Sequence, residues 1–193
     1  MPDNNTYRRR TALKAIGGGL FVAIAGVPAS ARSNDLAHEL NSVRKATQQY
    51  KDVGAARDDG YAVVAPYVPE MGFHFVNPGL FAPDADATVD ITEPAILVYA
   101  TTGNYRPEPG DVHDENRDSD LRLAAVEYGH LGDDGPPGTP ANYFSDETAT
   151  RNLKVSEEEG WEWTPGPDIN ALHVWVHRGN PAGVFNPTNP TID

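Results

Sequence analysis

The chain of 193 residues contains no cysteine. Disulfide bonds, zinc sites built on thiolates and thiol catalysis are therefore excluded, and no lipid can be attached to a cysteine behind a leader. Stability has to come from the hydrophobic core, from a bound ion or from assembly. The sequence also lacks a glycine-rich phosphate loop, a Gly-x-Ser-x-Gly elbow and a His-Glu-x-x-His motif. Nucleotide binding and the standard hydrolase chemistries thus have no support.

Basic residues are scarce: 15 Lys and Arg stand against 28 Asp and Glu, which gives a formal net charge of −13. A field of this sign repels nucleic acid and anionic lipid, so we expect no nucleic-acid partner. So many carboxylates with so little lysine are typical of proteins from salt-loving archaea. The alternative interpretation is a surface that binds cations or basic partners.

Four of the basic residues lie in the first 14 positions. They form a cluster that begins at Arg8 and continues as Arg9-Arg10-Thr11-Ala12-Leu13-Lys14. The pattern Arg-Arg-x-x-Leu-Lys is similar to a twin-arginine (Tat) export signal, and an ordinary Sec signal is the alternative. An apolar run that contains several glycines, residues 15–27, comes next. It is shorter than the roughly 18 residues needed to span a bilayer. Ala29-Ser30-Ala31 then supplies the small-x-small pattern of a signal-peptidase site.

The sequence therefore predicts a Tat-like signal peptide over 1–31 and a single globular domain over 32–193. We expect an extracellular or cell-surface location with no stable membrane anchor after cleavage. The Tat translocase and signal peptidase would be the partners during export. Removing a leader that holds four basic residues and one acidic residue leaves 11 basic and 27 acidic residues, a formal charge of −16.

Residues 34–60 read as a helix or helical hairpin, with Asn34 or Asp35 as the expected cap and Gly60 as its end. Short strand patterns follow without intervening helices, at 61–64, 73–76, 95–99, 121–128 and 172–176. This order predicts an α+β fold, with the N-terminal helical region packed on a mainly antiparallel sheet of about five strands. A β-sandwich or small barrel with an N-terminal helix is the alternative. Two long acidic loops are expected, at 101–120 and 129–168.

Three histidines, His74, His173 and His177, sit among apolar residues, whereas His38 and His113 are expected to be solvated. His173 and His177 are four residues apart, which on a strand is about 13 Å and too far to chelate one ion. Their segment is rich in valine and tryptophan and favours a strand.

A site can still form across strands. Glu127 falls late in an apolar strand, on the predicted face of Leu123 and Ala125, where burial requires a partner or a metal. If His74, Glu127 and His173 share one sheet face, two imidazoles and a carboxylate meet. That is the ligand set of many zinc, copper and non-haem iron sites. The alternatives are a buried hydrogen-bond network of the same residues, or His177 in place of His173 beside His74.

The sequence around His74 is partly repeated around His177. Both segments read His-x-x-Asn-Pro, followed by small and apolar residues up to a phenylalanine. Asn before Pro commonly begins a turn, so we interpret the two segments as similar strand exits with a phenylalanine folded back into the core. A functional repeat is the alternative. In Trp161-Glu162-Trp163 both indoles fall on one side of an extended segment, which favours core packing or a loop cover over a sugar-binding platform.

Four further local motifs stand out in the chain. They are Met71-Gly72-Phe73-His74-Phe75-Val76-Asn77-Pro78, Val126-Glu127-Tyr128, Leu172-His173-Val174-Trp175 and Asn180-Pro181-Ala182-Gly183-Val184-Phe185. Together they resemble a family of exported bacterial and archaeal proteins without an established activity. The resemblance covers residues 45–190 and implies that His74, Glu127 and His173 are the matching positions. It departs at His177, where the family pattern has tryptophan, and this weakens His177 as a ligand.

The sequence thus predicts an exported soluble protein with a His/Glu pocket that binds a divalent metal or a small ligand. Whether it is an enzyme stays open. The alternative is a non-catalytic secreted or cell-surface interaction module in which the same residues form a buried polar network.

Overall fold

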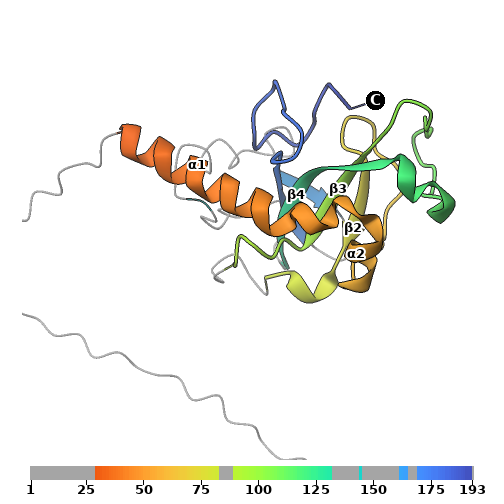
Figure 1. The fold of residues 1–193 in the computed structure, drawn as a ribbon, viewed down its shortest axis with the longest axis horizontal. Helices are drawn as coiled ribbons and strands as arrows, with labels where there is room; N and C mark the ends of the chain where they lie inside the picture. The colour runs from red at the N-terminus through yellow and green to blue at the C-terminus, as the bar shows by residue number, and fades with distance from the viewer. Residues whose placement is uncertain (1–28, 83–88, 132–143, 145–160, 165–168, 193) are drawn as a thin grey trace, which may run out of the picture.

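The computed structural model describes residues 29–82, 89–131, 144, 161–164 and 169–192 (Figure 1). Its helical region comprises α1 (Ala29–Ala46), the 3-10 segment η1 (Thr47–Lys51) and α2 (Val53–Asp58). The N-terminal half of α1 extends away from the sheet, and its C-terminal half leads onto it (Figure 1). No helix in the described part of the chain is both long and apolar enough to cross a membrane.

The helical region differs from the prediction at its start and agrees at its end. α1 begins at Ala29, so neither Asn34 nor Asp35 caps it, because the alanine and arginine residues before them continue the helix. Asp52 caps α2 instead, accepting a hydrogen bond from the Gly54 amide at 2.9 Å. Gly60 ends the region with a φ of 90°, as expected of a left-handed C-terminal glycine. The predicted leader lies outside the described residues except for its last three.

One open sheet follows, in which every neighbouring pair of strands is antiparallel. Its spatial order is β1-β2-β3-β4-β6-β5. The strands are β1 (Ala62–Val63), β2 (Phe73–Val76), β3 (Ile96–Thr101), β4 (Leu121–Leu131), β5 (Trp161–Thr164) and β6 (Ile169–Val174). Two short 3-10 segments, η2 (Pro78–Leu80) and η3 (Glu115–Asp120), lie in the connections. The α+β prediction with an N-terminal helical region is confirmed, and the sandwich and barrel alternatives are not adopted.

β5 is the strand that the sequence did not predict, because it lies inside the acidic stretch 129–168 that reads as a loop. It pairs with β6 at the edge of the sheet. A four-residue strand carries too little alternation to stand out among acidic neighbours and glycines. The sheet therefore continues past the last strand that apolar patterning reveals.

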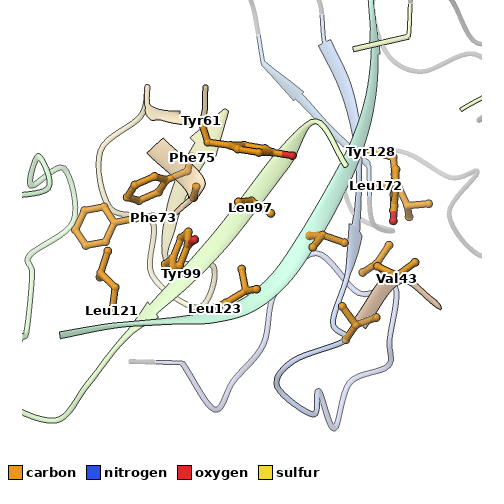
Figure 2. Close-up of a cluster of buried hydrophobic side chains, with 14 of the residues drawn as sticks. Val43, Tyr61, Phe73, Phe75, Leu97, Tyr99, Leu121, Leu123, Tyr128 and Leu172 are labelled. Carbon is orange, nitrogen blue, oxygen red and sulfur yellow. The ribbon is translucent and has the colours of Figure 1, made fainter. Parts of the chain in front are cut away.

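The helices cover one face of the sheet, and the large aromatic side chains fill that interface (Figure 2). Alternate residues of β2 and β3 point into it, namely Phe73, Phe75, Leu97 and Tyr99. Fully burying each such side chain stabilises the fold by about 1.5–3 kcal/mol. Buried tyrosine hydroxyls are satisfied locally, as where Tyr99 donates to the carbonyl oxygen of Tyr50 at 2.6 Å.

Aliphatic residues and one tryptophan line the opposite face, which we call the C-terminal face because Trp175 and Ile192, from the chain after β6, pack on it. Two apolar clusters lie there, one containing Val98, Ala100, Ala124, Ala125, Trp175 and Ile192, the other Val76, Ala95, Ile96 and Ala171. The C-terminal segment is held in place by the backbone N–H of Asn189, which donates to the carbonyl oxygen of Glu70 at 2.8 Å. Trp175 donates its indole N–H to the carbonyl oxygen of Asn186 at 2.5 Å.

A β-bulge in β4 changes which residues share a face. Val98 pairs with Ala125, but the next residue of β3, Tyr99, pairs with Leu123, so Ala124 is the extra residue. Leu123 consequently packs in the helix-side core, and the prediction that it shares a face with Glu127 is wrong. The bulge also directs the carbonyl oxygen of Ala124 at the amides of His177 and Arg178, at 3.1 and 3.0 Å.

The two Asn-Pro segments are turns, as predicted. The Asn77 side chain accepts from the Gly79 amide at 3.1 Å, and Asn180 accepts from the Ala182 amide at 2.9 Å. Asn186 and Asn189 repeat the arrangement further along the chain. Phe185 folds back into the helix-side core, as the structural interpretation of the partial repeat predicts. Phe81, the corresponding residue of the first segment, is only partly buried and packs on the opposite face, against the cluster of Val76, Ala95, Ile96 and Ala171.

Candidate metal centre

The structure brings His74, Glu127 and His173 together on the C-terminal face. They come from β2, β4 and β6 respectively. Glu127 and His173 are direct cross-strand partners, so their side chains leave the sheet side by side. His74 reaches them across β3, where its own partner is the small residue Val98.

One oxygen of Glu127 lies between the two imidazoles. Its Oε1 is 2.9 Å from His173 Nε2 and 3.1 Å from His74 Nε2. One potential ligand atom from each residue falls within 4.8 Å of the other two, and no other such group occurs in the described part of the chain. The two imidazole rings are perpendicular, with centroids 5.8 Å apart.

All three residues are buried, with exposed fractions of 0 % for His173, 1 % for Glu127 and 8 % for His74. Burying an ionisable carboxyl at this depth is costly unless a counter-charge or a metal compensates it. Burial raises the pKa of Glu127, but the attraction of His173 and then of His74 outweighs it. The pKa of the carboxyl is therefore held well below its usual value. The site favours the carboxylate, which is the form that binds metals.

The contact between Glu127 and His173 is short but is not a well-formed hydrogen bond. Within the described chain, Glu127 Oε1 and both ring nitrogens of His173 are buried without a hydrogen bond of acceptable geometry. At 2.9 Å the distance suffices, so the direction of the ring N–H is what fails. The donor atoms are therefore close together without being satisfied by one another.

Trp175 supports the site from its own strand exit. Its indole stacks on the His173 ring, with centroids 5.9 Å apart and an angle of 20° between the planes. The two residues are two positions apart, so strand alternation places them on the same face. Since the indole is also tied to Asn186, the stacking restricts the orientation of the His173 ring.

His177 lies elsewhere, against the helical region. Its Nε2 is 2.8 Å from the hydroxyl oxygen of Thr47, which itself donates to the carbonyl oxygen of Val43. Because the hydroxyl proton is used in that bond, the ring nitrogen is the donor to Thr47. Burial, followed by the charges of Lys51 and Arg44, lowers the pKa of His177 to about 4. His177 is not part of the three-residue cluster.

A second polar cluster was not predicted. His113 is buried, which contradicts the expectation that it is solvated, and its Nε2 is 2.7 Å from Asp118 Oδ1. Its ring packs on Phe73 and Phe75, and Asp118 is also held by Arg57 at 3.2 Å. The contacts with Phe73, Phe75 and Arg57 join segments far apart in the sequence, so no local pattern could reveal them. His38 is exposed, as expected.

Two histidines and one carboxylate suit several first-row transition ions, since imidazole binds zinc, copper and iron and a carboxylate adds charge. Three comparisons with known proteins add nothing to this assignment: no family model matches the chain, no curated protein matches it, and no solved structure matches it. The donor set itself thus provides the functional argument.

Proposed function

We propose that the protein is an exported metal-binding protein in which His74, Glu127 and His173 hold one divalent transition ion. The observation that carries this proposal is the buried approach of Glu127 Oε1 to His173 Nε2 at 2.9 Å and His74 Nε2 at 3.1 Å. An ion would bind all three donors and compensate the buried carboxylate. A zinc, copper or iron ion is compatible with the set.

Three protein ligands distinguish such a site from a closed structural one. Structural zinc sites have four protein ligands, whereas catalytic sites keep a position for water or substrate. The described chain supplies three residues to the cluster. The site therefore suits an ion that binds a further, non-protein ligand, and a bound water would be available for chemistry.

Metal analysis and titration test the proposal. The protein is purified without chelator, its metal content is measured, and apo protein is then titrated with Zn²⁺ and Co²⁺ by calorimetry. We expect one ion per chain and, for His74→Ala and His173→Ala, an affinity loss of more than about 100-fold. That is beyond the 10–100-fold typical of residues that only support a ligand.

His38→Ala is the matched control, since His38 is an exposed histidine on α1 and its loss should leave the affinity unchanged. Circular dichroism checks that each variant is folded. A folded wild-type protein that binds neither ion, with the same thermal midpoint in EDTA as in Zn²⁺, would rule the proposal out.

A non-catalytic interaction module is the second candidate. It is favoured by the same short contacts, since the two imidazole side chains at 2.9 and 3.1 Å can hold Glu127 without any ion. The two candidates differ in the effect of metal. If the protein is an interaction module, EDTA leaves its stability unchanged, and Glu127→Gln acts by removing a network of charges. If the protein binds a metal, EDTA lowers the thermal midpoint of the wild type but not that of Glu127→Gln.

A further inference from the structure

We propose that residues 175–192, the chain after β6, form a brace that positions the two histidines of the candidate centre. We call this segment the C-terminal brace. Docking of the brace raises the metal affinity of the site, and a bound ion in turn stabilises the docked brace, because such coupling is reciprocal. The inference rests on the proposed function and adds a link between the site and the end of the chain.

One end of the brace fixes the ring of His173. Trp175, the first residue of the brace, stacks its indole on that ring, with centroids 5.9 Å apart and 20° between the planes. Trp175 is buried, its indole N–H donates to the carbonyl oxygen of Asn186 at 2.5 Å, and its backbone N–H donates to that of Val184 at 2.9 Å. Residues further along the brace therefore set the plane of the indole, and the indole limits the rotation of the imidazole.

The other end of the brace reaches the strand that carries His74. The backbone N–H of Asn189 donates to the carbonyl oxygen of Glu70 at 2.8 Å. Glu70 lies in the turn that leads into β2, four residues before His74, and its φ of 62° is the one positive value among the non-glycine residues that the structure describes. A non-glycine residue keeps such a conformation only where its surroundings over-determine it. The hydrogen bond from Asn189 is one of these contacts, so the brace contributes to fixing the start of β2.

The brace is itself held between these two ends. The Asn189 side chain, which is fully buried, donates to the carbonyl oxygen of Gly179 at 3.2 Å and accepts from the Thr191 backbone N–H at 3.1 Å. The backbone N–H of Arg178 donates to the carbonyl oxygen of Ala124 in β4 at 3.0 Å. Packed side chains and hydrogen-bond networks of this kind carry energetic coupling between distant positions.

The brace and the site span the same strands. His74 is on β2 and His173 is on β6, and β3 and β4 lie between them. Ile192, near the end of the brace, packs in one cluster with Trp175 and Val98, and Val98 is the cross-strand partner of His74. An ion that needs both imidazoles therefore favours the arrangement of β2 and β6 in which the brace is docked.

Substitutions at both ends of the brace test the inference. Apo protein is titrated with Zn²⁺ by calorimetry for Trp175→Leu, which removes the stacking ring, and for Asn189→Ala, which removes the buried side-chain hydrogen bonds. We expect each substitution to lower the affinity by about 10–100-fold, the range typical of residues that support a ligand. Trp175→Phe keeps an aromatic ring against His173, so its loss of affinity should be smaller.

Val53→Ala is the matched control. Val53 is buried on α2 in the helix-side core, so its truncation lowers stability, but it lies on neither the brace nor a strand of the site. Its affinity for Zn²⁺ should equal that of the wild type. Wild-type affinity in Trp175→Leu and Asn189→Ala, or an equal loss in Val53→Ala, would overturn the brace and leave the metal-binding function intact. A wild-type protein that binds no ion would overturn both.

Amide hydrogen exchange tests the reciprocal effect on the unsubstituted protein, so it does not depend on how the variants fold. Exchange is followed by NMR with and without Zn²⁺. The backbone amides of Trp175 and Asn189 should exchange more slowly with the ion bound. The amide of Tyr61, which donates to the carbonyl oxygen of Ala56 in the helical region, should change less. Equal slowing at all three amides, or none in the brace, contradicts the coupling.

Discussion

At the scale of single residues, the same side chain takes opposite roles according to its contacts. His173 is fully buried beside a carboxylate, whereas His177, four residues on, donates to Thr47 and lies near two cationic side chains. The rise of extended chain separates the two histidines, and the chain leaves the sheet between them, after Val174. The spacing alone would have suggested a chelating pair, but the geometry excludes it.

His177 should make stability depend on pH in a defined window. Its pKa is about 4 in the folded protein, below the ordinary value of 6.5, so the unfolded state binds more protons between these two values. Stability should therefore be fully present above pH 6.5 and decrease as the pH falls towards 4. Urea midpoints measured across this range check it.

His177→Gln is the informative variant, because glutamine can donate to Thr47 from the same place but does not titrate. The wild type should lose more of its urea midpoint between pH 6.5 and 4 than the variant does. The other histidines and the carboxylates are the same in both proteins, so their effects cancel. Parallel pH profiles for the two proteins would contradict the assignment.

Residue-level reading of the sequence succeeded where strand alternation is regular. Alternation along the sequence places His74 opposite Phe73 and Phe75 and puts His173 with Trp175, as in the structure. It failed for Leu123, because the bulge at Ala124 reverses the alternation in β4. A bulge depends on pairing with another strand, so one strand's pattern does not reveal it.

At the scale of elements, the entry to β2 is fixed by a tight turn. Gly72 has a φ of 103° and accepts no side chain, since an added Cβ would lie 2.4 Å from the carbonyl oxygen of Tyr99. This close approach brings β2 onto β3, two residues before His74. A change in this turn would thus affect a strand that carries the site.

Gly72→Ala should destabilise the protein by roughly 3 kcal/mol or more, because it combines an unfavourable φ with a clash against backbone. Urea unfolding measures the loss. Gly103→Ala is the matched control, since nothing lies within 4 Å of an added Cβ there, and it should change stability by less than about 1 kcal/mol. Equal effects of the two substitutions would contradict the packing described for Gly72.

Elements were predictable in proportion to their apolar content. The strand patterns at 73–76, 95–99 and 121–128 correspond to β2, β3 and β4, all rich in buried aliphatic or aromatic residues. β5 was missed because it is short and lies in an acidic stretch, although it pairs with the next strand, β6. The burial of His113 was missed because it depends on Phe73 and Phe75, which are distant in the sequence, so long-range packing overrides local polarity there.

At the scale of the whole molecule, the excess of acidic residues sets the response to salt. The full chain has a formal charge of −13, which favours expansion through self-repulsion. Screening shortens the reach of this repulsion from about 10 Å at 0.1 M salt to about 3 Å at 1 M. We therefore interpret the composition as an adaptation to high salt.

The urea midpoint should rise when sodium chloride is increased from ~0.1 M to ~1 M, since salt screens repulsion that is stronger in the compact state. Urea is the suitable denaturant because it adds no ions. Sucrose at matched water activity is the control for general exclusion effects. A midpoint that stays constant or falls with salt contradicts the interpretation.

The three residues of the candidate centre come from β2, β4 and β6, and in the sheet β3 lies between β2 and β4. The donor atoms therefore meet only when these four strands have paired in the order β2-β3-β4-β6. Metal binding at the proposed centre would then report a sheet whose central strands are in register.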